Sequence, residues 1–230
     1  VRMEGRVSTS GVESERAYRD IGLNVRYRVG GPAGKLEPTV AADQLDIAMS
    51  DALEVIYAVE QNVTVVAIDA MVQKNPTVII AHPGVKRLED LRGKPIAIGA
   101  ASNITFWPWL RQRYHFTDDQ KRPYGFSVQP FLADAALSQQ GFVTSEPFSI
   151  EKGGVQPTVF LLADFGYPPY SETLVVTQTM LAGRRYALGR FTRGVAEGGT
   201  GYVAEPGPAT ARLRGVRPRR PTGRCVPTWS

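Results

Sequence analysis

The sequence predicts an α/β protein with largely parallel β-sheets. Short β-rich runs alternate with helical stretches through residues 20–180, and several of these runs pass through a turn of small residues into a helix. No segment of the chain repeats another. With 230 residues, the chain can form one or two domains that each bury a core.

The expected strands are short runs rich in valine, isoleucine, leucine and aromatic residues, as buried strands of a parallel sheet require. They span residues 23–29, 46–49, 63–70, 78–82, 95–99, 126–128, 141–144, 159–163 and 174–177.

The expected helices lie between these strands. They span residues 37–44, 53–60, 88–91, 104–114, 118–121, 131–139 and 147–151. Asp51 is a good N-cap for the helix at 53–60, Pro108 suits the first turn of the helix at 104–114, and Pro147 suits the first position of the last helix.

The two ends of the chain differ from its middle. Residues 1–16 show neither a strand nor an apolar helix, and the segment GVAEGGTG, residues 194–201, is a poor helix because each glycine costs about 1 kcal/mol relative to alanine. From about Arg212 onward we expect disorder. We interpret both ends as marks of a truncated or frame-altered chain.

The formal net charge of +5 comes from the carboxyl-terminal part of the chain. Residues 183–230 contain ten arginines and two glutamates, whereas residues 1–182 contain seventeen basic and twenty acidic residues. We therefore expect the arginines to be solvated and predict no nucleic-acid partner. Electrostatic binding of the tail to nucleic acid or anionic lipid is the alternative.

The chain offers little for a metal site or a membrane span. Cys225 is the single cysteine, and His82 and His115 share no metal-binding spacing, so we expect no metal and no cofactor. No apolar run approaches the roughly 20 residues that cross a bilayer, and the first residues lack the apolar core of a signal peptide.

A turn of small residues at 99–103 follows the strand expected at 95–99 and opens a helix. Unpaired backbone N–H groups at a helix start favour an anion or a polar acceptor, and Ser102 and Thr105 add hydroxyl groups. Ligands of open α/β sheets bind outside the carboxyl ends of the strands, where this turn is expected. We therefore predict Ser102 and Thr105 as ligand-binding residues.

Several motifs resemble the periplasmic solute-binding proteins of ABC importers. They are LEDLRGKPIAIG, TFWPWL, YHFTDDQKRPY, GFVTSEPFSIEK and FLLADFGYPPY. The branch most similar is the NMT1/THI5-like group of thiamine-pyrimidine-synthesis proteins, together with nitrate, sulfonate and taurine binding proteins. The resemblance covers roughly Ala17 to Ala182, which is most of the chain.

This resemblance implies a two-lobed α/β fold of type II with a ligand cleft between the lobes, incomplete here at both termini. Lobe 1 would comprise residues 1–80 and 174–211, lobe 2 would comprise residues 83–172, and residues 212–230 would form a disordered tail. The two crossings between the lobes would lie at residues 78–82 and 173–176.

The resemblance also places TFWPWL and TSEPF at the cleft. Trp107 is then expected to stack on a flat ligand, and Glu146 to accept hydrogen bonds from ring N–H or amino groups. Two alternatives remain. Phe106 and Leu110 share one helix face, so their segment could form core, and Glu146 could be a first-turn acid that the helix dipole favours after an N-cap at Ser145.

Four further residues are predicted to bind ligand. Ser50 and Asp51 follow a strand of lobe 1 and open a helix, although capping alone would explain Asp51. Tyr167 and Tyr170 precede the second crossing and could be either walls of the cleft or packing residues under a loop.

The function implied by the resemblance is that of a substrate-binding component of an ABC importer. Such a protein is periplasmic and monomeric, has no catalytic residues, captures a small solute and delivers it to a membrane permease; the signal peptide is absent from this chain. The aromatic residues and Glu146 favour a flat nitrogen heterocycle such as a thiamine-pyrimidine precursor, and a sulfonate, taurine or nitrate is the alternative.

Two other classes share the fold. Pyrimidine-synthesis enzymes carry a cysteine-rich motif that this sequence lacks, and effector domains of transcription regulators follow a helix-turn-helix segment that is not seen before lobe 1. The enzyme and the regulator domain are therefore weaker hypotheses than the solute-binding protein.

Overall fold

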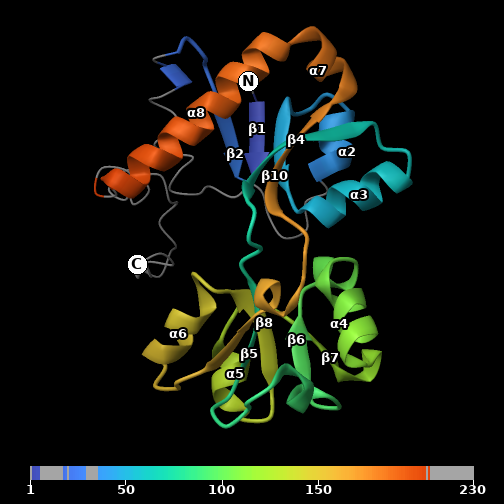
Figure 1. The fold of residues 1–230 in the computed structure, drawn as a ribbon, viewed down its shortest axis with the longest axis vertical. Helices are drawn as coiled ribbons and strands as arrows, with labels where there is room; N and C mark the ends of the chain where they lie inside the picture. The colour runs from blue at the N-terminus through green and yellow to red at the C-terminus, as the bar shows by residue number, and fades with distance from the viewer. Residues whose placement is uncertain (1, 6–17, 20, 30–35, 206, 208–230) are drawn as a thin grey trace. The chain divides into compact units, whose positions relative to one another are not determined.

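The computed structural model describes residues 2–5, 18, 19, 21–29, 36–205 and 207. The chain forms two compact units, each with its own five-stranded sheet (Figure 1). Of the described residues, unit 1 contains those up to Met71 and those from Glu172 to Gly207, and unit 2 contains Val72–Ser171. The chain therefore passes between the units at residues 71–72 and 171–172, whereas the sequence placed these crossings at 78–82 and 173–176.

The sheet of unit 1 has the strand order β2-β1-β3-β10-β4. Its strands are β1 (Arg2–Gly5), β2 (Arg26–Val29), β3 (Ile47–Ser50), β4 (Val65–Val72) and β10 (Ser171–Thr177). β1 pairs in parallel with both β2 and β3, and β10 runs antiparallel to β3. The expectation of no strand in residues 1–16 is wrong, because pairing on both edges makes a strand of RMEG despite its single apolar residue, Met3.

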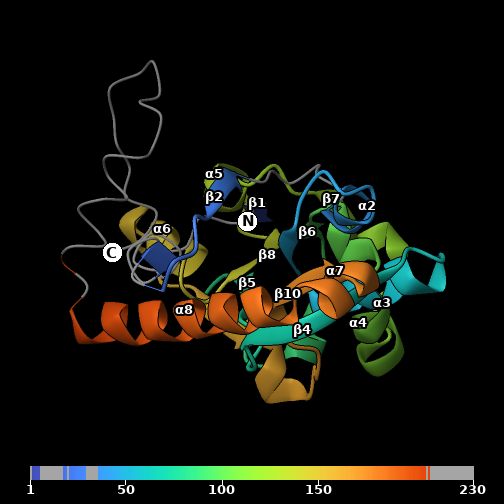
Figure 2. The ribbon, with the colours of Figure 1, turned by 90° about the horizontal axis from the view of Figure 1, so that it is seen from above.

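Helices cover both faces of this sheet (Figure 1, Figure 2). They are α2 (Leu36–Ala41), α3 (Ala52–Glu60), α7 (Gln178–Gly183) and α8 (Arg185–Ala204). Side chains alternate along each strand, so Ala48 of β3 packs with residues of α2 and α3 on one face. Its neighbours Ile47 and Met49 pack with residues of α8 on the other face.

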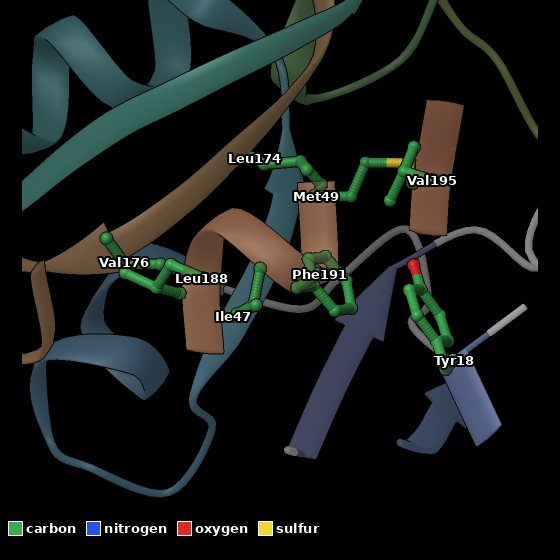
Figure 3. Packing of buried hydrophobic residues seen from close by; sticks show 8 residues of the cluster. All are labelled: Tyr18, Ile47, Met49, Leu174, Val176, Leu188, Phe191 and Val195. Atoms are coloured by element: carbon green, nitrogen blue, oxygen red, sulfur yellow. The ribbon is translucent and has the colours of Figure 1, made fainter. Parts of the chain in front are cut away.

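Helix α8 was not among the helices expected from the sequence. It includes the glycine-rich residues 194–201, so the prediction of a poor helix there is wrong. Figure 3 shows the reason: Phe191 and Val195 of α8 enter the core with Tyr18, whose ring is stacked 4.8 Å from that of Phe191. Burial of this apolar face outweighs the low helix propensity of glycine.

The sheet of unit 2 has the order β7-β6-β8-β5-β9. Its strands are β5 (Thr77–Ala81), β6 (Ile96–Ile98), β7 (Lys121–Pro123), β8 (Ser138–Phe142) and β9 (Thr158–Leu161). Its α-helices are α4 (Phe106–Tyr114), α5 (Gln129–Ala133) and α6 (Glu146–Lys152), and four 3-10 helices lie at Leu88–Leu91, Ala101–Asn103, Asp118–Gln120 and Leu162–Phe165. One core of unit 2 joins Val78 and Ile80 of β5 to Phe131 and Ile150.

Two segments of unit 2 differ from the prediction. The helix expected at 131–139 ends at Ala133, and Ser138–Phe142 forms β8 between β6 and β5. The strand expected at 126–128 is absent; the third parallel strand, β7, lies earlier, and the backbone of Phe126 has a left-handed φ of 55°. The polar run SQQ gave no strand signal in the sequence, because Ser138 and Gln139 are buried in β8 although their side chains are polar.

The disorder expected from about Arg212 and the cysteine Cys225 lie outside the described residues. Within the described residues, no helix combines the length and the apolar character that a membrane span needs.

Gly194 provides a test of the packing between α8 and Tyr18. A Cβ atom at Gly194 would lie 2.4 Å from two ring atoms of Tyr18, whereas a Cβ atom at Gly189 of the same helix would meet no atom within 4 Å. We predict that Gly194→Ala lowers the melting temperature by several degrees despite the higher helix propensity of alanine. Gly189→Ala, the matched control, should raise it. Thermal unfolding followed by circular dichroism measures both changes, and a rise of equal size in both variants would contradict the packing shown in Figure 3.

Candidate functional site

Three parallel strands of unit 2 end at one edge of its sheet. β6 pairs in parallel with β7 on one side and with β8 on the other, so their carboxyl ends face the same way. The residues that follow the ends of β6 and β7 are Gly99 to Ser102 and Tyr124 to Phe126, and Gly141 to Glu146 include the last two residues of β8 and the turn after it. We call this edge the polar edge of unit 2, and it is where open α/β sheets bind ligands.

The side-chain amide of Gln140 joins β8 to the turn after β6. Its Oε1 atom accepts a hydrogen bond from the backbone N–H of Gly99 over 2.6 Å and another from the hydroxyl of Ser102 over 2.5 Å. Ser102 is buried, and its hydroxyl proton is already donated to Gln140. A direct contact between Ser102 and a ligand stays a prediction and would use the hydroxyl oxygen as an acceptor.

Glu146 turns back toward the strand that precedes it. One carboxylate oxygen accepts a hydrogen bond from the backbone N–H of Phe142 over 2.8 Å, and the other accepts one from the hydroxyl of Tyr124 over 3.0 Å. Glycine at position 141 makes this possible, because a Cβ atom there would lie 2.9 Å from Cβ of Glu146. Ser145 makes no side-chain capping bond to α6. The carboxylate is therefore fixed at the polar edge, and its contact with ligand stays a prediction.

Trp107 lies in the interior of unit 2. Only 1% of the residue is exposed, and its indole N–H donates to Asp118 over 2.8 Å. The neighbouring residues Phe106 and Leu110 are also buried, which confirms the core alternative for this segment. Stacking of Trp107 on a ligand stays a prediction, and the absence of an exposed face counts against it.

Asp118 is held at this position by three donors, which are the Trp107 indole, the Lys121 ammonium and the Arg111 guanidinium. The pKa of Asp118 lies below its usual value. The hydrogen bond from the Lys121 ammonium is the largest cause, and the hydrogen bond from the Trp107 indole is the next. The contact therefore involves an ionised carboxylate at neutral pH.

Phe126 and Tyr124 provide the aromatic surface of the polar edge. Phe126 is 56% exposed, and its ring centroid lies 5.1 Å from that of the buried Tyr124. A bulky residue with a left-handed backbone is uncommon and costs about 1–3 kcal/mol, which marks this position as a candidate functional residue. Sequence reasoning missed Phe126 because it assigned a strand there, and it missed Gln140 because it placed the preceding residues in a helix.

The remaining predicted residues of unit 2 have varied surroundings. The Thr105 hydroxyl donates to the backbone carbonyl of Ala101 over 3.3 Å. Tyr167 is buried, with its ring 5.4 Å from that of Trp109, which supports the packing alternative. Tyr170 is 49% exposed. The structure thus places Ser102 and Glu146 at one edge of the sheet, whereas Tyr167 packs against Trp109.

In unit 1, Ser50 lies at the end of β3 between two carboxyl groups. Its hydroxyl contacts Glu37 of α2 and also Glu54 of α3, the latter over 3.1 Å. Ser50 and Glu37 are buried, and Thr173 donates to the backbone carbonyl of Ser50 over 2.8 Å. Asp51 accepts a hydrogen bond from the backbone N–H of Leu53 and therefore caps α3, which is the alternative to ligand binding that the sequence offered for this residue. Among the described residues, no cluster of histidine, cysteine, aspartate and glutamate fits a metal ion.

Glu54 should make the stability of unit 1 depend on pH. Burial, followed by the charge of Glu37, raises the pKa of Glu54 above its usual value. A raised folded-state pKa contributes stability that is present below the unfolded-state pKa and is lost as the pH rises through the folded-state pKa. We predict that Glu54→Gln, which cannot ionise, gains a few degrees in melting temperature over the wild type as the pH rises above about 4.3, the ordinary pKa of a glutamate.

The control for this prediction is Glu60→Gln, which changes an exposed acid of the same helix. Its melting temperature should follow that of the wild type at every pH. A difference in melting temperature between Glu54→Gln and the wild type that stays constant with pH would contradict the prediction.

Similarity to known proteins places the chain in a family. The family model described as NMT1/THI5 like matches residues 17–209. No match is found among curated protein sequences.

Solved structures show the same fold. The periplasmic aliphatic sulphonate binding protein of Escherichia coli aligns with a TM-score of 0.69 and 13% identity, over 94% of this chain and 73% of that one. The alkanesulfonate-binding protein of Xanthomonas axonopodis pv. citri bound to MOPS aligns with a TM-score of 0.67 and 10% identity, over 94% of this chain and 80% of that one. A Salmonella typhimurium periplasmic binding protein with high arginine specificity aligns with a TM-score of 0.59 and 11% identity, over 93% of this chain and 97% of that one. The chain has the α/β fold of periplasmic binding proteins and belongs to the NMT1/THI5-like family.

Proposed function

We propose that this chain is the substrate-binding component of an ABC importer and binds a flat nitrogen heterocycle, such as a thiamine-pyrimidine precursor. The observation that carries this proposal is the polar edge of unit 2, where Tyr124 contacts both the fixed carboxylate of Glu146 and the exposed ring of Phe126. Glu146 can accept hydrogen bonds from ring N–H or amino groups, and Phe126 offers a face on which a flat ring can stack.

The ligand would contact the polar edge of unit 2. Family membership supports this arrangement, as does the fold shared with periplasmic binding proteins. The same reasoning supports a periplasmic location, a membrane permease as the partner, a monomeric state, and no catalytic activity.

An anionic ligand such as a sulfonate, taurine or nitrate fits the polar edge less well. The partners that the structure describes for Ser102, Gln140 and Glu146 include no lysine or arginine. An anion would therefore meet the charge of Glu146 without a balancing cation from these residues. Two of the structural neighbours bind sulfonates, and that property belongs to those proteins.

A ligand screen tests this proposal. The panel contains 4-amino-5-hydroxymethyl-2-methylpyrimidine, methanesulfonate, taurine, nitrate and arginine, and the measurement is the rise in melting temperature, because a ligand of the native state stabilises it by mass action. We predict a rise with the aminopyrimidine and none with nitrate or methanesulfonate. A rise with the two anions alone would contradict the proposed ligand class.

Two variants then test the site. Glu146→Gln removes the charge but keeps a carbonyl acceptor, and Phe126→Ala removes an exposed ring, so neither should change the unliganded melting temperature by more than a few degrees. Each is predicted to weaken binding of the aminopyrimidine by more than about tenfold in a calorimetric titration. Glu151→Gln, at an exposed acid of the same helix α6, is the control and should bind as the wild type does.

A further inference from the structure

We propose that the side-chain amide of Gln140 is a fixed hydrogen-bond donor of the ligand site and contacts an acceptor atom of the solute. This inference rests on the proposed function, because it assigns a specificity-determining contact to the same polar edge. The contact was not evident from the sequence, in which Gln140 follows a segment expected to be a helix.

The orientation of this amide follows from its partners. The backbone N–H of Gly99 can only donate, so the atom that it contacts over 2.6 Å must be the oxygen of Gln140. The hydroxyl of Ser102 donates to the same oxygen over 2.5 Å. The amide cannot flip without placing its NH₂ group against the N–H of Gly99 and losing that hydrogen bond, so the NH₂ group must point away from Gly99.

This NH₂ group has no hydrogen-bond partner among the described residues. The neighbouring Gln139 differs, because it is buried and its NH₂ group donates to the backbone carbonyl of Gln140 over 3.4 Å. Gln140 is partly exposed and lies between Ile79 of β5 and the end of β6. A donor that is fixed, partly exposed and unpaired within the protein is free to bind an acceptor that arrives with the ligand.

The arrangement defines what the ligand must offer at this position. An acceptor such as a ring nitrogen, a carbonyl oxygen or an anionic oxygen would satisfy the Gln140 donor, whereas an ammonium group would be repelled. Glu146, on the same edge, requires the opposite property, because both its oxygens are acceptors. A solute that carries an acceptor and a donor on one edge, as an aminopyrimidine ring does, meets both requirements.

Gln140→Glu separates the two roles of this side chain. The carboxylate can still accept from Gly99 and Ser102, so the turn after β6 is kept, but the NH₂ donor is replaced by an acceptor. We predict that this variant melts within a few degrees of the wild type and binds 4-amino-5-hydroxymethyl-2-methylpyrimidine at least about tenfold more weakly by calorimetry. Gln112→Glu makes the same charge change at an exposed position of α4 and should leave binding unchanged.

A second variant covers the case in which Gln140→Glu does not fold. In Gly99→Ala, the added Cβ atom would lie 3.4 Å from Nε2 of Gln140, which is an ordinary contact that partly shields the donor. It should also weaken binding.

The outcomes distinguish this inference from the proposed function. Loss of binding in a folded Gln140→Glu or Gly99→Ala variant supports the donor role. Wild-type binding of the probe in both variants would overturn that role and leave the proposed function standing. If the wild type itself binds no compound of the panel, both the proposed function and the role of Gln140 are rejected.

Discussion

The hydrogen bond from the backbone N–H of Phe142 to Glu146 organises the edge of unit 2 that we assign to ligand binding. It turns the first residue of α6 back onto the end of β8, and the second oxygen of the same carboxylate holds the hydroxyl of Tyr124. One charged group thus joins the ends of two strands and supports the ring beneath Phe126. The contact depends on glycine at position 141, because a side chain there would occupy the space of Glu146 and Ile80. Hydrogen bonds to an ionised acceptor are roughly twice as strong as neutral ones, so a single carboxylate can hold this edge together.

The polar groups of the edge are fixed before any ligand binds. Gln140 is held by Gly99 and Ser102, and Glu146 by Phe142 and Tyr124. A site with fixed donors and acceptors loses less conformational entropy on binding than one with mobile side chains. The strained backbone of Phe126 fits the same view, because such strain persists only where the surrounding structure holds it. Unit 1 also concentrates polar groups at a strand end, where Ser50 lies between Glu37 and Glu54.

The α/β class and most elements could be predicted from the sequence, because apolar runs such as the one that forms β5 identify buried strands directly. Prediction failed where hydrogen bonds or long-range packing decide the outcome. β8 contains Ser138 and Gln139, which are buried without being apolar, and α8 contains glycines that its contact with Tyr18 compensates. For the site, the TSEPF motif led to Glu146, but TFWPWL led to Trp107, a core residue, rather than to Phe126. No local pattern distinguishes a buried aromatic residue from an exposed one when both follow a strand.

Hydrogen–deuterium exchange of the backbone amides, with and without the panel compound that stabilises the protein most, tests whether the ligand binds at the polar edge of unit 2. We predict slower exchange in the ligand complex at residues 99–102, 124–126 and 140–146 of unit 2, because the ligand covers and orders the polar edge. Slower exchange confined to α4 around Trp107, or spread evenly over both units without a maximum at these three segments, would contradict it.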